Sequence, residues 1–461
     1  LRPIDYYDIL MHASDAVLSG GIRRSATICL FSPDDEDMLN AKVGDWFVAN
    51  PQRGRSNNSA VLVRHKTSKE KFSGLFDSVK HFGEPGFVWV EDEGITVNPC
   101  VEIGMWPEIE LNGKVQSGWQ FCNLSEINVR KANTKEEFLE ACKAASIIGT
   151  LQAGYTTFPY LGEVTEAITK REALLGVSMT GMMDHPDISF NPEIQKEGAE
   201  AVLYWNEVMA NHLNINSAAR ATCVKPSGSA SCLLGTSSGI HPQHAELYIR
   251  RVQANKLEFP VNHFKSINPD AVEDSIWSAN NTDYSISFLC KVPRGAKVKN
   301  KMSAIELLEH VHLTQNTWVE HGTRHKACVK SFLRHNVSNT ITVKDEEWID
   351  VENYIFNNKS SFAGISLLAA SGDKDYDQAP FTTVYTPAEL VRMYGDASMF
   401  ASGLIVDGLH VFDSLWKACD TVRDLGETIN VKKLRERIIE AKEFEFNGIR
   451  HLDETSPDAE L

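Results

Sequence analysis

The sequence predicts an α/β protein with a barrel-like core and an appended C-terminal helical part. Strand-like apolar runs alternate along the chain with segments whose apolar residues recur at helical spacing, which is typical of α/β proteins. Of the 461 residues, 42% are hydrophobic, which is enough to bury a large core. No linker rich in Gly, Pro or Ser marks a boundary, and we expect the core over 1–385 and the C-terminal part over 386–461.

The individual elements follow from spacing and from the residues that interrupt it. Apolar residues at three- and four-residue intervals predict helices, and glycine or proline marks several of their ends. The helices expected are 5–18, 34–39, 136–152, 198–212, 305–319, 388–393 and 431–446. Apolar, β-branched and aromatic runs predict strands. The strands expected are 26–31, 87–90, 221–225 and 338–343. The polar stretch 453–461 is predicted to be a loose tail.

The charge and hydropathy of the chain exclude several classes of protein. A formal net charge of -16 argues against a duplex nucleic-acid binder, because such proteins neutralise phosphates with Lys and Arg. It does not exclude a nucleotide ligand, since one phosphate needs only a local cradle. No apolar run approaches the ~20 residues that span a membrane, and residues 1–5 resemble neither a signal nor a transit peptide. We therefore expect a soluble cytoplasmic protein that binds neither nucleic acid nor membrane.

The cysteines and histidines do not form a metal-binding pattern. The nine cysteines are scattered and odd in number, unlike a secreted disulfide scaffold. No C-x-x-C pair is present, which argues against a structural zinc site. His241 and His244 flank Pro242, but a third ligand is lacking nearby. The sequence therefore predicts no metal site, and a structural role for these histidines.

The first candidate site is the run Asn98-Pro99-Cys100-Val101-Glu102. Pro99 keeps Asn98 extended, and in an extended or looped segment alternate residues project to one side. A thiol, a carboxylate and an amide would then meet, with Glu102 as general base and Asn98 holding it or a substrate hydroxyl. The same run is also compatible with a turn that carries a buried cysteine and a surface glutamate.

A second candidate is a run of small residues that follows Lys225, namely Pro226-Ser227-Gly228-Ser229-Ala230-Ser231. Hydroxyl residues around a glycine can present several hydroxyls and backbone N–H groups together, which suits a phosphate if a helix follows. The lysine precedes the glycine, so the run is not a Walker loop. An ordinary Ser/Gly turn is the alternative.

A third candidate is the glycine-arginine run Ser19-Gly20-Gly21-Ile22-Arg23-Arg24. The glycines let the backbone bend sharply. The two arginines can hydrogen-bond a base or a phosphate in fork geometry. A solvated loop with surface charge is the alternative.

Taken together, these runs resemble the large subunit of the ribonucleotide reductases, in the family's order and over nearly all of the chain. Residues 98–103 look like the family's finger loop, 226–231 like its substrate phosphate loop and 19–24 like its specificity loop. The run Phe121-Cys122-Asn123-Leu124 looks like the strand that carries one of two reducing cysteines. Residues 335–340 and 376–380 also resemble late family segments.

The resemblance implies a fold and a mechanism. The fold is a ten-stranded α/β barrel with Cys100 on a central loop. A thiyl radical at Cys100 takes hydrogen from the ribose 3′ carbon of a ribonucleotide, Glu102 accepts the 3′ hydroxyl proton, and Asn98 orients the neighbouring groups. The 2′ hydroxyl leaves as water, and a cysteine pair that includes Cys122 supplies the electrons. The product is a deoxyribonucleotide for DNA synthesis. Such a radical must be shielded from water and oxygen, and a cofactor generates it.

The resemblance also implies the cofactor class. Residues 223–228, 237–242 and 248–251 look most like the adenosylcobalamin-dependent class, and the C-terminal part lacks the adjacent tyrosine pair of the oxygen-dependent class. The implied cofactors are adenosylcobalamin and an external thiol reductant such as thioredoxin. Two alternatives are an oxygen-dependent core served by a separate radical-generating subunit and a non-catalytic nucleotide-binding remnant. A remnant would have no reason to retain both Cys100 and Glu102.

The resemblance leaves part of the family's barrel unaccounted for. Only 18 residues precede Ser19, so the first barrel strand and the first reducing cysteine are expected outside this chain. No other cysteine is an obvious substitute. We expect the catalytic barrel over 1–385 to be incomplete at its N-terminal side and completed by a complementary N-terminal polypeptide. The other partners implied are a ribonucleotide di- or triphosphate substrate and a deoxyribonucleotide or ATP effector for allosteric control. A homodimer is left open.

Overall fold

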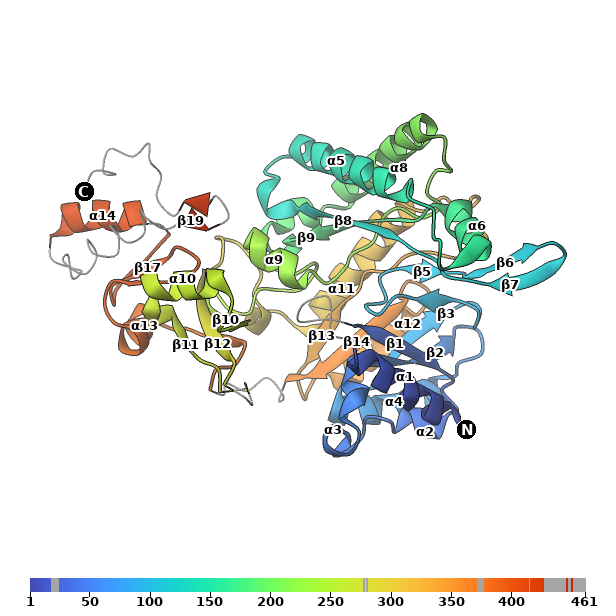
Figure 1. The fold of residues 1–461 in the computed structure, drawn as a ribbon, viewed down its shortest axis with the longest axis horizontal. Coiled ribbons are helices and arrows are strands. Elements are labelled where there is room, and N and C mark those ends of the chain that lie inside the picture. The colour runs from blue at the N-terminus through green and yellow to red at the C-terminus, as the bar shows by residue number, and fades with distance from the viewer. Residues whose placement is uncertain are drawn as a thin grey trace. The chain divides into compact units, whose positions relative to one another are not determined.

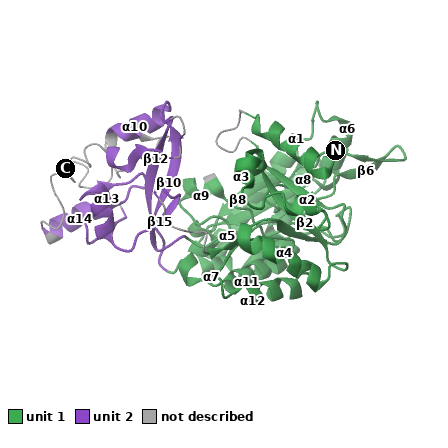
Figure 2. Cartoon of the chain, turned by 90° about the horizontal axis from the view of Figure 1, so that it is seen from below, with its two compact units in different colours: residues 1–243, 295–373 green, residues 244–294, 374–461 purple. Residues whose placement is uncertain are grey.

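The computed structural model describes residues 1–17, 25–276, 278, 281–370, 377–413, 415–426, 445–446 and 449–450. They form two compact units, 1–243 with 295–373 and 244–294 with 374–461 (Figure 2). Strands and helices alternate along unit 1, which confirms the α/β class (Figure 1). The predicted boundary between the catalytic barrel (1–385) and the C-terminal part (386–461) divides the chain by function and stays a prediction. Over the described ranges, no helix has both the length and the apolar character to cross a membrane.

Five strands of unit 1 form one sheet in the order β1-β2-β3-β14-β13. Neighbours are parallel, except that β14 runs antiparallel to β3. The strands are β1 Thr27–Phe31, β2 Ser56–Val63, β3 Gly86–Val90, β14 Gly364–Ala369 and β13 Thr340–Val343. The strands predicted over 26–31, 87–90 and 338–343 are therefore present.

A second group of strands continues from β13. The Ser338 N–H, just before β13, donates to the Val224 carbonyl at 2.9 Å, and the Cys223 N–H donates to the Val177 carbonyl at 3.0 Å. Val177 lies in β9 Leu175–Thr180, which pairs in parallel with β8 Asn123–Asn128. The predicted strand over 221–225 is thus reduced to isolated bridges, but it joins the two groups into one hydrogen-bonded series from β1 to β8. The ten-stranded barrel stays a prediction.

Four long helices of unit 1 begin behind a capping side chain that accepts a backbone N–H of the first turn. The caps are Ser68, Thr134, Asn191 and Ser303. The helices that they start are α4 Lys69–Phe82, α5 Lys135–Ala153, α8 Pro192–Leu213 and α11 Ala304–Thr314. The other helices of the unit are α1 Pro3–Asp15, α2 Glu36–Leu39, α3 Trp46–Ala49, α6 Gly162–Glu172, α7 Pro186–Ser189, α9 Gly228–Leu234 and α12 Trp348–Asn357.

The helix predicted over 305–319 changes its winding part-way. After α11 it continues as the π-helix Gln315–Val319, a form that carries one more residue per hydrogen-bonded ring than an α-helix. The Gln315 side chain forms two hydrogen bonds of 3.0 Å with the backbone of 335–337. The Trp318 Nε1 donates to the Cys223 carbonyl at 2.9 Å. This one helical turn therefore ties both segments of the strand series together.

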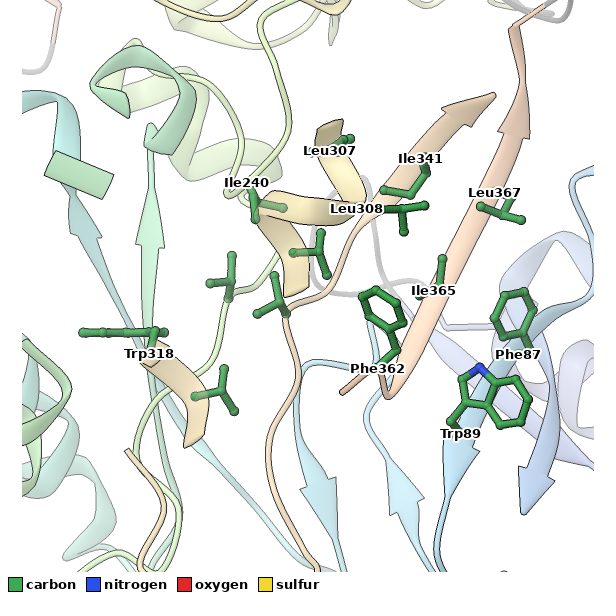
Figure 3. Packing of buried hydrophobic residues seen from close by; sticks show 14 of the residues in the cluster. Phe87, Trp89, Ile240, Leu307, Leu308, Trp318, Ile341, Phe362, Ile365 and Leu367 are labelled. Carbon is green, nitrogen blue, oxygen red and sulfur yellow. The ribbon is translucent and has the colours of Figure 1, made fainter. Parts of the chain in front are cut away.

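The main core of unit 1 lies between its sheet and the covering helices. Phe72 of α4 packs edge to face on Phe87 of β3, with ring centroids 5.2 Å apart, and its ring lies 5.1 Å from that of Trp89. Figure 3 shows the core extending from these β3 side chains to the neighbouring elements, through Phe362, Ile365, Leu367, Ile341, Leu307, Leu308, Ile240 and Trp318. Because β3 leads into residues 96–105, this packing fixes the position in space from which that segment starts.

Unit 2 is built on an antiparallel sheet in the order β11-β12-β10-β15. Its strands are β10 Leu247–Asn255, β11 Val272–Asp274, β12 Asp283–Lys291 and β15 Phe381–Thr383. A smaller sheet has β16 Ser398–Met399, β17 Ile405–Val406 and β18 Val411–Phe412. The helices are α10 Phe259–Ile267, α13 Pro387–Tyr394 and α14 Leu415–Leu425. The helix predicted over 388–393 is confirmed as α13, whereas the sheet at 244–294 is not among the predicted elements.

The predicted late helix over 431–446 is wrong at its end. Glu445–Phe446 is the strand β19, paired antiparallel with β20 Ile449–Arg450. Residues 431–444 and the tail 453–461 lie outside the described residues.

Glycine at position 104 is required by a close backbone approach. A Cβ at Gly104 would overlap the carbonyl oxygen of Arg334, which is backbone and cannot move aside cheaply. We predict that Gly104→Ala lowers the free energy of unfolding by about 1–3 kcal/mol, as overpacking does. Gly74→Ala is the matched control, because nothing lies within 4 Å of its added Cβ in α4, and it should stabilise by about 0.5–1 kcal/mol. Urea unfolding of both variants measures the difference, and equal effects would contradict the prediction.

Candidate active site

Cys100 lies on a turn between two short strands, β4 Thr96–Val97 and β5 Gly104–Met105. The Val101 N–H donates to the Asn98 carbonyl at 2.8 Å, which closes the turn. Val101 has φ 64°, a left-handed conformation that costs a β-branched residue of order 1–3 kcal/mol. The segment is therefore not extended, and the alternation that predicted one shared face does not apply to it.

Three backbone carbonyls of the turn accept hydrogen bonds from other segments of the chain. The Asn57 side chain donates to the Pro99 carbonyl at 2.8 Å, and the Ser338 hydroxyl donates to the Cys100 carbonyl at 2.6 Å. The Asn336 N–H donates to the Glu102 carbonyl at 2.9 Å. The partners come from β2 and from the segment before β13, so the sheet itself fixes the turn. Cys100 is left partly exposed.

The strained Val101 is accommodated by a glycine on the neighbouring strand β14. A Cβ added to Gly364 would lie 2.5 Å from Cγ1 of Val101. Glycine at this position thus makes room for the side chain that the left-handed turn directs toward β14.

Glu102 is buried beside Cys100, with only 1% of its surface exposed. Burial raises the pKa of its carboxyl above the usual range, while a hydrogen bond from Asn98 and the charge of Lys225 act in the opposite direction. Its Oε2 has no hydrogen-bond partner in the described part of the chain. The surface glutamate considered from the sequence is therefore wrong. A buried carboxylate oxygen without a partner is costly, and it is suited to receive a proton from a bound molecule.

Cys122 lies directly before β8 and faces the same interior. Its Sγ lies 3.1 Å from the position that a Cβ of Gly176 would occupy. It packs with Ile103 in one small cluster. Burial raises the pKa of the Cys122 thiol, and the negative charge of Glu102 raises it further. The structure therefore places Glu102 within hydrogen-bond reach of Asn98 and within electrostatic range of Cys122, and the catalytic roles of these residues stay a prediction.

The predicted phosphate run 226–231 forms a bend followed by α9. The Ser227 hydroxyl donates to the Glu126 carboxylate at 3.0 Å, and its N–H donates to the Ser238 hydroxyl at 2.8 Å. The Ser231 hydroxyl donates to the Gly228 carbonyl at 3.0 Å. A phosphate would have to replace these internal bonds, so the role of this run stays a prediction. The side chain of Ser229 and the glycine-arginine run at 19–24 lie outside the described residues.

Several residues that shape the site gave no signal of their own in the sequence. Asp184 accepts the Ser237 N–H at 3.0 Å and the Gln243 amide at 2.6 Å, which holds the loop that carries Ser238. His241, in contrast, was singled out in the sequence for a structural role, and both of its ring nitrogens bond to backbone atoms at 2.9 Å each. A pattern of sequence spacing does not reveal such contacts, because the partners are distant in the chain.

No protein-family model matches the sequence. The adenosylcobalamin-dependent ribonucleoside-triphosphate reductase of Lactobacillus acidophilus is 26% identical over 303 residues, which cover 55% of this chain and 38% of that protein. The enzyme of the same description from Levilactobacillus brevis is 23% identical over 429 residues, which cover 82% of this chain and 53% of that protein. A crystal structure of a B12-dependent class II ribonucleotide reductase matches the fold with a TM-score of 0.68 at 20% identity, over 86% of this chain and 57% of that one.

The chain is therefore similar in sequence to adenosylcobalamin-dependent ribonucleoside-triphosphate reductases and similar in fold to a class II ribonucleotide reductase. It spans about half or less of the length of the curated reductases that it matches. The Cys100 turn and the Cys122 strand are described parts of the chain whose geometry is suited to chemistry.

A buried ion pair lies next to the segment that leads to Cys122. Glu172 and Arg220 are both fully buried, and their closest atoms, Arg220 Nη1 and Glu172 Oε1, lie 2.8 Å apart. The other carboxylate oxygen accepts the Gln120 amide at 2.8 Å, and Gln120 in turn accepts the Trp106 N–H at 2.7 Å. Gln120 lies two residues before Cys122, so the pair fixes the entry to that strand. Burial alone would raise the pKa of Glu172, but the charge and hydrogen bonds of Arg220 outweigh it and hold the pKa at about 2.

Removing one partner of this pair should be strongly destabilising. We predict that Glu172→Gln lowers the free energy of unfolding at pH 7 by about 3–5 kcal/mol, because Arg220 is left buried and unpaired. Since the folded pKa of Glu172 is depressed, its contribution is present above about pH 4.5 and is lost as the pH falls toward 2. Guanidinium unfolding at several pH values measures both effects.

The exposed pair Lys170–Glu166 provides the matched control for this prediction. Glu166→Gln should change the free energy of unfolding little, as is usual for exposed pairs. Adding Arg220→Met to Glu172→Gln should recover part of the lost stability. A loss below about 1 kcal/mol in Glu172→Gln would contradict the role assigned to the pair.

Proposed function

We propose that this chain carries the catalytic core of an adenosylcobalamin-dependent ribonucleotide reductase, which converts ribonucleotides to 2′-deoxyribonucleotides by thiyl-radical chemistry for DNA precursor synthesis. The observation that carries the proposal is Glu102. Its carboxylate is buried, has an unpaired oxygen, follows Cys100 by two positions in the same turn and lies within electrostatic range of Cys122. The curated relatives described above are named as adenosylcobalamin-dependent ribonucleoside-triphosphate reductases, which favours a triphosphate substrate.

In this proposal each residue of the turn has one task. The sulfur of Cys100 takes a hydrogen atom from the 3′ carbon of the ribose, and Glu102 accepts the proton of the 3′ hydroxyl. Asn98 holds the carboxylate in place, which the hydrogen bond between them supports. The 2′ hydroxyl leaves as water, and Cys122 contributes to the reducing electrons. Residues 226–231 bind the substrate phosphates, and Ser19, Gly20, Gly21, Arg23 and Arg24 transmit the identity of a deoxyribonucleotide or ATP effector.

The residues around Cys100 fit an external radical source. Cys100 is partly exposed at the tip of a clamped turn, whereas Glu102 beneath it is buried. Adenosylcobalamin, when bound, supplies the one-electron oxidant that the thiol of Cys100 requires. The clamped backbone of 99–102 fixes the point from which the partly exposed side chain of Cys100 leaves the turn. An external thiol such as thioredoxin would then restore the reducing cysteines.

The proposal includes a ten-stranded barrel and a complementary polypeptide. Within the described part, β1 lies at the edge of its sheet beside β2, and β8 lies at the edge of its sheet beside β9. A further strand could pair with the second side of β1 or of β8. A polypeptide that adds strands there would close the barrel. Mixing the chain with a candidate upstream polypeptide should then raise the rate of nucleotide reduction. Equal activity of the purified chain alone, with cobalamin and a thiol, would contradict this part.

The cofactor is tested by binding. Adenosylcobalamin is titrated into the chain, with and without the complementary polypeptide, and its visible absorption spectrum is recorded. We expect the binding to be saturable. Saturable binding supports the cobalamin-dependent class. Activity that depends on a separate metal-bearing subunit, with no cobalamin binding, would instead support an oxygen-dependent reductase.

The chemistry is tested at Glu102 and Cys100. Because burial raises the pKa of Glu102, this carboxylate should become protonated at a higher pH than an ordinary glutamate does as the pH is lowered. The value of kcat/KM should fall over the same pH range. We predict that Glu102→Gln abolishes this acidic limb and lowers kcat by about 10²–10⁴-fold, the usual contribution of a general base. Cys100→Ser should abolish reduction.

Cys142→Ser is the control for these variants, because Cys142 is buried on α5 outside the site cluster. It should keep the activity of the unaltered chain. Deoxyribonucleotide formation by Cys100→Ser at an undiminished rate would overturn the proposed function.

A further inference from the structure

A buried histidine, His335, lies between the Cys100 turn and the start of β9. Its side chain is fully buried. The Gly104 N–H in β5 donates to its Nδ1 at 3.3 Å, and its Nε2 lies 2.8 Å from the carbonyl oxygen of Leu175, the first residue of β9. One imidazole therefore contacts both the end of the turn and the strand beside β8.

These two bonds define the protonation state of the ring. A carbonyl oxygen only accepts hydrogen bonds, so the Nε2 of His335 carries a hydrogen, and Nδ1 is unprotonated because it accepts the Gly104 N–H. Burial and the charge of Arg220 lower the pKa of His335 to about 3. The imidazole is therefore neutral near pH 7, and it acts through its two hydrogen bonds rather than through a charge.

The partner of Nε2 lies directly beside the Cys122 strand. In the parallel ladder of β8 and β9, Leu175 is paired with Asn123, the residue that follows Cys122. The position of the Leu175 backbone therefore sets the position at which the chain leaves Cys122 and enters β8.

The partner of Nδ1 lies directly beside the residue through which the turn approaches Cys122. Gly104 follows Ile103, whose Cδ1 lies 3.1 Å from the position that a Cβ of Gly176 would occupy. The Sγ of Cys122 lies at the same distance from that position. The turn and the Cys122 strand therefore meet at Gly176, next to the two backbone groups that the imidazole holds.

The imidazole links the turn to β9 directly, whereas the strand series links them through an intervening segment. In that series, residues 220–224 lie between 335–338 and β9. The side chain of His335 spans this segment in one step. The three bonds to the carbonyls of the turn hold it to β2 and to 336–338. The two bonds of the imidazole set its distance from β9.

We propose that His335 is a positioning residue, whose imidazole sets the separation between the Cys100 turn and the strand that begins after Cys122. This inference rests on the proposed function, in which both elements act on one substrate. A reaction of that kind is sensitive to their spacing, because a misplacement of about 1 Å can lower a rate by about 10²-fold.

Two substitutions each retain one half of this bridge. The side-chain amide of asparagine reaches the place of the histidine Nδ1, and the longer glutamine reaches the place of Nε2. His335→Asn should therefore keep an acceptor for the Gly104 N–H and lose the bond to Leu175, and His335→Gln should do the reverse. His310→Gln is the matched control, because His310 is a partly buried histidine of α11 that stacks on Phe190.

The hold on the turn is tested without nucleotide or cofactor, by alkylating the folded chain with iodoacetamide and mapping the peptides by mass spectrometry. Cys100 reports on the turn, the exposed Cys232 is the internal reference, and the buried Cys142 reports on unfolding. We expect His335→Gln to raise the alkylation rate of Cys100 relative to Cys232 by about 3–10-fold, the effect of losing one ordinary hydrogen bond. Cys142 should stay protected, and His310→Gln should change none of the three rates.

Two outcomes of the alkylation would overturn the inference. One is an unchanged rate for Cys100 in folded His335→Gln. The other is that Cys142 becomes reactive together with Cys100 in both variants of His335, because the histidine would then support the whole fold rather than the spacing of two elements.

The link to β9 is tested by steady-state kinetics of the chain mixed with the complementary polypeptide and adenosylcobalamin. We expect His335→Asn and His335→Gln each to lower kcat by about 10–100-fold and to leave KM for the ribonucleotide unchanged, since the spacing affects the reaction more than substrate binding. An undiminished kcat in folded His335→Asn would overturn the inference and leave the proposed function intact. Absence of product in the unaltered mixture, with the alkylation result as expected, would instead count against the proposed function.

Discussion

The Cys100 turn depends on hydrogen bonds to backbone carbonyls that come from distant parts of the chain. Pro99, Cys100 and Glu102 each accept one such bond, from Asn57, Ser338 and Asn336 respectively. The donors are separated by about 280 positions of sequence, so the turn can form only when β2 and the segment before β13 are already in one sheet. The turn therefore depends on the assembled sheet for these three hydrogen bonds.

The structure accommodates unfavourable groups at this turn and compensates for them elsewhere. Val101 is in a left-handed conformation, and Glu102 is buried with an unpaired oxygen. Each would be destabilising alone. The aromatic core around Trp89 and the buried Glu172–Arg220 pair lie on either side of this segment in the chain. Unfavourable local geometry that is supported by a rigid surrounding structure is a common property of functional sites.

The sequence was sufficient for the elements and for the main site residues, and insufficient for contacts between distant segments. Periodicity located β1, β3 and α5 within one residue, because their apolar spacing is regular, whereas α8 begins six residues before its predicted start. It also selected Cys100 and Glu102, because a thiol and a carboxylate two positions apart stand out as a chemical pair, although the extended geometry expected for them is replaced by a left-handed turn at Val101. It did not reveal that Cys223 shares a cluster with Cys122, because the strand order that brings them to β9 is not encoded in local spacing.

The same limit explains two of the differences between the predicted and the observed fold. The antiparallel sheet within 244–294 has strands of mixed polarity, for which apolar spacing is a weak signal. The π-helix at 315–319 has the apolar residues of an ordinary helix, and its altered winding depends on the bonds that Gln315 forms with 335–337.

The π-helix also limits how the length of this helix can vary among relatives. Deleting one residue between Gln315 and Trp318 would restore ordinary α-helical winding and would change the angle between these two side chains around the helix axis. Gln315 and Trp318 could not then both reach the strands that they hold. Relatives that keep the strand series should therefore tolerate insertions and deletions in their loops, but preserve the residue count between Gln315 and Trp318.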